Sequence, residues 1–261
     1  MNQDLSTFFS FQSLLVFLLV MARVSGMIST APLLSTFPIP MMAKAGLAAL
    51  SAFIMYPFVL KISLFQMPND LITMSIMIFK ELFVGILIGF CAELIFIGIQ
   101  IGGQLLSIQM GLAIANALDP VTKQQVPVVG QFYLFMASMV FIYLNGHHWL
   151  FSCVSESYNT IPIGINFEFV TNIVPKILYF TSQLFAIAFN LTIPIFGMLF
   201  IIDIALALVS KIMPQMNIFM VGLPLKIYVG LALMGFFMST TAVYLTGLMG
   251  NMLNSLKNIF I

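Results

Sequence analysis

Charged side chains are rare in this sequence, and a few of them fall where helices are expected to be apolar throughout. The five such residues are Arg23, Glu81, Glu93, Asp203 and Lys211. A charge inside a membrane helix costs at least about 2.5 kcal/mol, so each needs a counter-ion, water or an interface. A proton or ion relay, as in a secondary transporter, is one interpretation; structural ion pairs or groups near helix ends are the other. Lys80 and Glu81 are adjacent and point in different directions on a helix, so they are not expected to be partners.

Small residues recur at helical spacing beside these charges. Four-residue steps place two carboxylates and two glycines on one helix face, at Glu81, Gly85, Gly89 and Glu93. The pattern continues with Gly98 and Gly102, and with Gln100 and Gln104. Such glycines let a second backbone approach closely. Packing within the chain is the simpler explanation, but two successive pairs flanked by acids and amides favour an assembly face.

Other chemistry has no candidate residues in this sequence. A phosphate-binding GxxxxGK[ST] loop and a nucleophile elbow are both absent, so we expect no enzymatic activity and no cofactor. His147 and His148 are neighbours, which do not share a helix face, so we expect no metal site. We interpret them as interfacial residues beside Trp149 at the end of a helix. A net charge of +1 argues against nucleic acid as a partner.

The composition predicts a membrane protein that must be built from helices. Of 261 residues, 7% are charged and 61% are hydrophobic, whereas soluble domains carry about 25% charged residues. About 20 apolar residues cross a bilayer core, so the long uncharged runs predict five or six spanning helices. The run near the N-terminus is expected to be a retained helix rather than a signal peptide. Cys91 and Cys153 lie in apolar sequence and are expected to be buried thiols.

The expected helices follow the uncharged runs and end at proline or glycine clusters. They cover about residues 9–28, 42–60, 70 to beyond 93, 124–155 after a loop, 174–211 and 224–256. The run 71–92 could instead form a hairpin. Pro194 predicts a kink packed against protein. Pro214 and Pro224 are expected to bound a short tip that continues neither helix, with Asn217 offering hydrogen bonds where the backbone is broken. These residues and Gln215 are assigned to an inter-subunit contact.

Four stretches in order resemble one protein family. They are ISTAPLLSTFPIPMMAKAGLA, GGQLLSIQMGLAIANALDP, YLNGHHWLFSCVSESYNTIPIG and ALVSKIMPQMNIFMVGLPLKIYVGL. Over about residues 23–233 the chain is similar to the FliR family of flagellar export-gate proteins. It departs from the family pattern at Ala207, where glycine is common, and at Lys211, where arginine is usual.

This resemblance implies an all-α, polytopic membrane protein of about six to eight long, kinked helices that assembles into a helical, funnel-like complex. Residues 1–261 would form one export-gate domain, with a FliP-like part over about 1–170 and a FliQ-like helical hairpin over about 171–261. The implied partners are FliP, FliQ, FlhB, membrane lipid and translocating flagellar substrates. The implied location is the bacterial inner membrane, within the flagellar basal body.

The segment 109–127 receives a specific role from the resemblance. On composition alone it is a plain loop between helices. In the family, the corresponding loop projects into the central passage as a plug, and Asp119-Pro120 would end the preceding helix. The residues assigned to this plug are Gln109, Met110, Gly111, Ala113, Ala115, Asn116, Asp119, Pro120 and Pro127. An ion- or proton-coupled transporter and a scaffold that never touches cargo are the alternatives.

Overall fold

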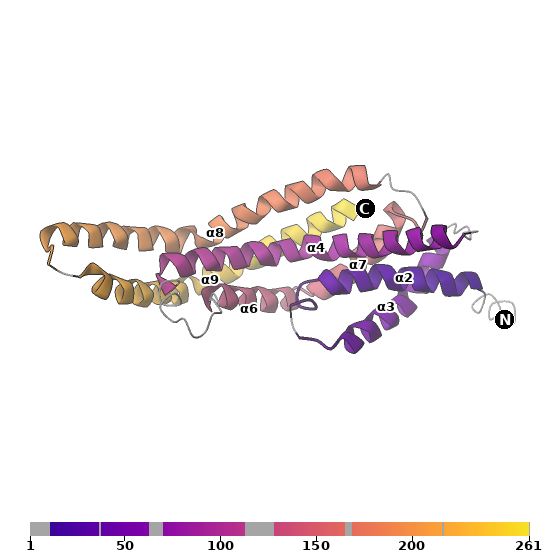
Figure 1. The fold of residues 1–261 in the computed structure, drawn as a ribbon, viewed down its shortest axis with the longest axis horizontal. Helices are drawn as coiled ribbons and strands as arrows, with labels where there is room; N and C mark the ends of the chain where they lie inside the picture. The colour runs from indigo at the N-terminus through magenta and orange to yellow at the C-terminus, as the bar shows by residue number, and fades with distance from the viewer. Residues whose placement is uncertain are drawn as a thin grey trace. The chain divides into compact units, whose positions relative to one another are not determined.

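A computed structural model describes residues 11–36, 38–62, 70–112, 128–164, 169–215 and 217–260, and within them the chain forms helices and no strands. The helices are α2 (Phe11–Thr30), α3 (Met41–Ile62), α4 (Leu71–Gln109), α6 (Val128–Tyr143), α7 (Gly146–Thr160), α8 (Phe169–Ile212) and α9 (Ile218–Phe260) (Figure 1). Five of these are long and apolar enough to cross a membrane, or six if α6 and α7, which meet at 66°, count as one broken span. The predicted all-α fold and number of spans are confirmed.

Two boundaries differ from the prediction. Residues 71–109 form one continuous helix of 39 residues and not a hairpin, because this stretch contains no proline and most of its glycines are packed against other helices. The NGHHW sequence ends α6 but also begins α7. Asn145 adopts the left-handed conformation (φ 54°) between the two helices, so His147 and His148 lie at the N-terminal end of α7 and not at the end of α6.

The chain divides into two compact units, and the first contains residues 1–94, 145–180 and 251–261. Within it, α2 packs against both α3 and α7, and α3 also contacts α7. The buried face of α2 carries residues at intervals of three and four, among them Val16, Leu19, Val20, Val24 and Met27, all fully buried. This spacing is that of an apolar helix stripe. The predicted burial of Cys91 and Cys153 is confirmed, and both lie in this unit.

The second unit contains residues 95–144 and 181–250. Here the end of α4 packs on α6 through the rings of Phe96 and Phe141, whose centroids are 5.5 Å apart. A Cβ on Gly98 or Gly102 would lie 3.1 Å from a backbone oxygen of α8, and a Cβ on Gly103 would lie 2.5 Å from the Cα of Gly130 in α6. These three glycines therefore allow close backbone contact of α4 with its neighbours.

Helices α8 and α9 run antiparallel and are joined by residues 213–217 (Figure 1). Asp203 near the end of α8 pairs with Lys226 near the start of α9, and farther from the turn Tyr244 is hydrogen-bonded to Asn190. Pro214 lies in the turn, as predicted. Pro224 does not bound it, because α9 begins at Ile218 and continues through this proline. Pro194 lies inside α8, but its side chain is exposed and not packed against protein.

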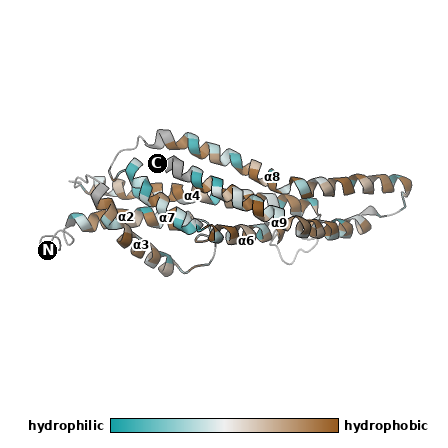
Figure 2. Cartoon of the chain, turned by 180° about the vertical axis from the view of Figure 1, so that it is seen from behind, coloured by the Kyte–Doolittle hydropathy of each residue, from teal (hydrophilic) through white to brown (hydrophobic). Residues whose placement is uncertain are grey.

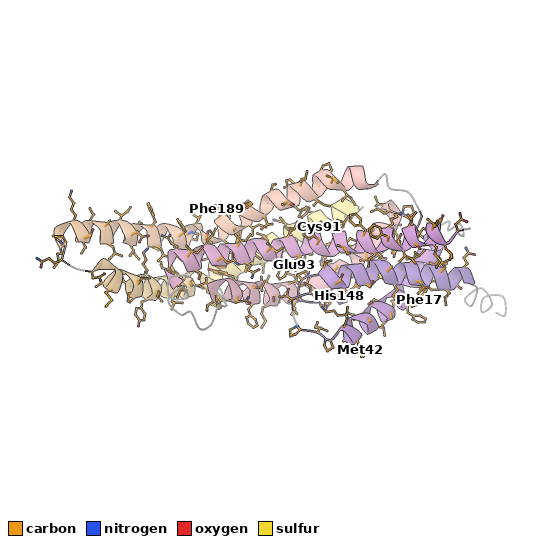
Figure 3. All side chains as sticks on the ribbon, viewed as in Figure 1. Phe17, Met42, Cys91, Glu93, His148 and Phe189 are labelled. Atoms are coloured by element: carbon orange, nitrogen blue, oxygen red, sulfur yellow. The ribbon has the colours of Figure 1, made fainter. Side chains whose placement is uncertain are left out.

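Most of the surface of these two helices is apolar. Within Ile173–Ile212 and within Met220–Ser255, an apolar part of 18 residues is only 17% and 11% buried, respectively. Apolar colouring dominates both helices near their turn (Figure 2). Phe189 of α8, labelled in Figure 3, is one of the exposed large side chains.

Candidate functional site

Arg23 lies in the fully buried stripe of α2, where an apolar residue would be expected from the pattern of its neighbours. Its guanidinium uses three separate nitrogens. Nε donates to Oε2 of Glu81 on α4 at 2.7 Å, Nη1 donates to Oγ of Ser157 on α7 at 2.7 Å, and Nη2 donates to the carbonyl of Ile161 at 2.9 Å. The planar fork of arginine spreads its five donors over three nitrogens, whereas the three donors of a lysine share one nitrogen.

The ring of Tyr158 completes this arrangement. It lies under the guanidinium, with 3.8 Å between the Arg23 carbon and the ring centroid, which is a cation–π contact. Arg23 and Glu81 are both fully buried. A buried ion pair requires additional hydrogen bonds to offset the loss of water, and here Arg23 has them.

Lys80 provides a second buried cation one residue before Glu81. Its Nζ donates to the carbonyl oxygens of Pro162 at 2.8 Å and Gly164 at 2.9 Å. Arg23 and Lys80 thus bind three carbonyls of the segment 161–164, which leaves α7. We call Arg23, Lys80 and Glu81 the carbonyl clamp. Lys80 donates to these carbonyls, while Glu81 is paired with Arg23.

The glycines beside the clamp bring α2 and α4 together. A Cβ on Gly85 would collide with the carbonyl oxygen of Arg23, and one on Gly89 would lie 2.7 Å from the carbonyl oxygen of Met27. A Cβ on Gly26 of α2 would collide with the carbonyl oxygen of Leu82. Gly85 and Gly89 therefore pack within this chain, which was the alternative to an assembly face. A further role of these glycines in assembly stays a prediction.

A second polar cluster lies within the other unit, at the end of α4. Asp203 of α8 accepts a hydrogen bond from the amide of Gln109 through Oδ2, at 2.9 Å, and forms an ion pair with Lys226 of α9 through Oδ1. Each carboxylate oxygen thus has one partner. The side chains of Asp203 and Lys226 are 34% and 21% exposed, so the pair is only partly buried.

The two residues after Gln109 also contact α9. Met110 is fully buried, and a Cβ on Gly230 would lie 2.6 Å from its Cε. Gly111 has a left-handed φ of 81°, and a Cβ there would lie 2.5 Å from Leu223 Cδ2. A left-handed glycine commonly ends a helix. Helix α4 accordingly ends at Gln109. The helix end predicted at Asp119-Pro120 lies outside the described residues.

The remaining predicted residues fall into four groups. The plug residues beyond Leu112, namely Ala113, Ala115, Asn116, Asp119, Pro120 and Pro127, lie outside the described residues. Lys211 was expected to be buried but is exposed in the last turn of α8. Glu93 is partly buried, and its Oε2 has no hydrogen-bond partner among the described residues. At the turn, Pro214, Gln215 and Asn217 are exposed.

Several residues that matter in these clusters were not singled out from the sequence. Lys80 was noted only as a neighbour of Glu81, and Ser157, Tyr158 and Lys226 were not considered. For Lys226 the signal was hidden by the misplaced turn, because it and Asp203 are about equally far from the observed turn at residues 213–217 but not from the predicted one. For Lys80 no signal existed, since its partners are backbone carbonyls, which every residue has.

These features define a polytopic helical membrane-type protein in which most buried charges are neutralised inside the chain. Comparison with known proteins identifies the class more closely. The family of Bacterial export proteins, family 1, matches residues 14–252. The flagellar biosynthetic protein FliR of Bacillus subtilis (strain 168) is 32% identical over 93% of this chain and 93% of its own length. FliR of Escherichia coli (strain K12) is 30% identical, over 91% and 89%, and FliR of Pectobacterium carotovorum is 29% identical, over 82% and 80%.

The chain belongs to family 1 of the bacterial export proteins, and the resemblance to FliR seen in its motifs is confirmed over nearly the whole sequence. Together with its spanning helices, this makes it a membrane component of a flagellar protein export apparatus.

Proposed function

We propose that this chain is a subunit of the flagellar type III protein export gate, in the bacterial inner membrane at the flagellar basal body. In this proposal it completes a channel with FliP and FliQ, contacts FlhB, and gates the passage of unfolded flagellar substrates. The motor of export lies elsewhere, since the sequence contains no nucleotide-binding loop.

The observation that carries this proposal is the length of the exposed apolar helices. Helix α8 has 44 residues and α9 has 43, which at 1.5 Å per residue corresponds to about 65 Å each. A bilayer core is only about 30 Å thick, and covering either helix with lipid alone would require a tilt of about 60°, beyond the observed 0–40°.

Exposed large apolar side chains nevertheless extend along α8 from Val174 to Ile212. The length that lipid cannot cover needs other protein against it, because an apolar surface of this size in water would aggregate. Neighbouring subunits of an export gate would provide that cover. This supports assembly with FliP and FliQ over a monomeric protein.

An ion- or proton-coupled transporter is less well supported. A relay needs ionisable groups that can release and accept protons along a path, whereas Arg23 and Glu81 form a buried pair and Asp203 is paired with Lys226. Among the charges considered for a relay, Glu81 and Glu93 each have one buried oxygen without a hydrogen-bond partner among the described residues, and the other oxygen of Glu81 is paired with Arg23. Two such groups do not make a pathway.

The gating part of the proposal concerns the segment 109–127, which we infer to seal the passage. The test is to delete Ala113–Asn116, express the chain with FliP and FliQ, and measure ion conductance and small-molecule leakage across the inner membrane. A matched control is deletion of Ser63–Gln66, four residues of the connection between α3 and α4.

We expect the first deletion to raise leakage while the complex still assembles, and the control deletion to leave the membrane tight. Recovery of the intact complex by affinity purification establishes assembly in both cases. Normal assembly without leakage in the first variant would make the segment an ordinary connector and would remove gating from the proposal. Failure of the parent chain to purify with FliP and FliQ would remove the whole proposal.

A further inference from the structure

The end of α4 is held on the α8–α9 hairpin by three consecutive residues, of which the first bonds to α8 and the other two contact α9. Gln109 reaches Asp203, which is paired with Lys226; Met110 packs on Gly230; and Gly111 packs on Leu223. Leu223, Lys226 and Gly230 are three and four residues apart and therefore lie on one face of α9. All of these contacts lie within the second unit.

The packing of Met110 and Gly111 against α9 also restricts which residues can form this contact. Met110 is fully buried and occupies space that exists only because residue 230 has no side chain. Gly111 combines a left-handed backbone with close contact to Leu223, so a larger residue there would be strained and would also clash. Residues 109–111 consequently fit the α8–α9 hairpin in one register.

The polar part of the contact is suited to opening. Asp203 and Lys226 are partly exposed, so water can take over their hydrogen bonds when the contact breaks. The carbonyl clamp differs in this respect, because Arg23 and Glu81 are fully buried and cannot separate without leaving a charge out of water. Of the two clusters, the one at the end of α4 is the one that can act as a reversible contact.

We propose that Asp203 and Lys226 form a charge latch that positions Gln109 and the end of α4 on the α8–α9 hairpin, and that this latch opens during export. The inference rests on the proposed function, since residues 109–111 lead directly into the segment inferred to seal the passage. Asp203 and Lys226 are positioning residues in this scheme and need not touch the substrate.

The first test exchanges the two charges. Asp203→Lys or Lys226→Asp alone places like charges together. Each is expected to raise ion leakage about tenfold or more, because losing a charge-assisted hydrogen bond shifts the equilibrium between the closed and the open contact by about that factor. The double exchange restores the ion pair, and Gln109 can still bond because its amide has both a donor and an acceptor. We expect the double variant to be as tight as the parent. Single variants that assemble and do not leak would overturn the proposal.

The second test locks the contact covalently and does not depend on leakage. Met110→Cys and Gly230→Cys are introduced together in a chain with Cys91→Ala and Cys153→Ala. Met110 Cγ lies 2.7 Å from the position of a Cβ on residue 230, close to the roughly 3 Å that separates a sulfur from the opposite Cβ in a disulfide. A control chain carries Met110→Cys alone.

In cells with the complete export apparatus, oxidation of the double variant is expected to stop secretion of flagellar substrates, and reduction is expected to restore it. The control chain should secrete under both conditions. Normal secretion from fully cross-linked complexes would show that the end of α4 does not leave α9, which would refute the latch. The deletion of Ala113–Asn116 would still report separately on whether the following segment seals the passage.

Discussion

The buried pair of Arg23 and Glu81 gives a prediction whose size follows from the contacts of each side chain. Arg23→Met keeps a long side chain of similar reach in the core but leaves the carboxylate of Glu81 buried without its cation. Removing one partner of a buried ion pair typically costs about 3–5 kcal/mol. Glu81→Leu should cost a similar amount, because it leaves the guanidinium buried without an anion.

The double variant Arg23→Met with Glu81→Leu should be less damaging than either single change. Both charges are then gone, and Ser157 Oγ keeps its bond to the carbonyl of Val154 at 2.6 Å. The remaining cost comes from the carbonyl of Ile161, which loses its hydrogen bond from Arg23. One buried carbonyl without a donor costs about 1–3 kcal/mol, so the double variant should lose about that much.

The assay is denaturant unfolding of the purified chain in detergent micelles, followed by helical circular dichroism, for the parent, both single variants and the double variant. Lys211→Met serves as the control, since it removes an exposed cation and should change the free energy of unfolding by less than about 0.5 kcal/mol. Typical stabilities are about 5–15 kcal/mol, so the single variants should also accumulate poorly in cells.

Two results would refute this reasoning. If the costs of the single changes simply add in the double variant, the two side chains do not interact energetically, in spite of their 2.7 Å separation. If both single variants are as stable as the Lys211 control, the clamp contributes nothing to the fold.

Three further predictions concern packing, backbone conformation and assembly. Gly85→Ala should destabilise the chain by at least about 1–3 kcal/mol, because its Cβ collides with α2. Gly247→Ala, whose Cβ meets open space, should stabilise α9 by about 0.5–1 kcal/mol. Equal effects of the two changes in unfolding experiments would contradict the packing of α2 on α4. Asn145→Val should cost about 1–2 kcal/mol and Asn145→Gly almost nothing, because residue 145 is left-handed; thermal unfolding that ranks them the other way would exclude that turn. A photo-crosslinking amino acid at Met198, which is 46% exposed on α8, should yield adducts with FliP or FliQ, and lipid adducts alone would contradict assembly there.

Much of the fold follows from the sequence because it depends on composition and breakers. Long uncharged runs give the spanning helices, and the proline of PQMN marks the turn between α8 and α9. The errors come from residues whose effect depends on position. Pro224 was predicted to bound the turn, but α9 begins at Ile218 and continues through this proline, even though a proline inside a helix removes a backbone hydrogen bond. The glycines of α4 were ambiguous between packing within the chain and packing on another subunit, and spacing cannot distinguish the two.

The clusters were predictable only in part. The need for a partner could be inferred for Arg23 and Glu81, because isolated charges in apolar helices are costly. Their actual pairing could not, since residues 58 positions apart are brought together by tertiary packing alone. Residue types do not reveal which carbonyls Lys80 binds, or that Met110 packs against Gly230. The plug role of segment 109–127 came from family resemblance and not from the residues themselves.

The most direct test of an export-gate subunit is contact with a substrate in transit. A photo-crosslinking amino acid is placed at Gln109, the last residue of α4, in cells where a flagellar substrate with a folded C-terminal fusion is stalled in the export apparatus. The account predicts substrate adducts from position 109 and adducts with FliP or FliQ from position 198. If complexes shown to hold the stalled substrate give no substrate adduct from position 109, the claim that this protein lines and gates the passage is contradicted.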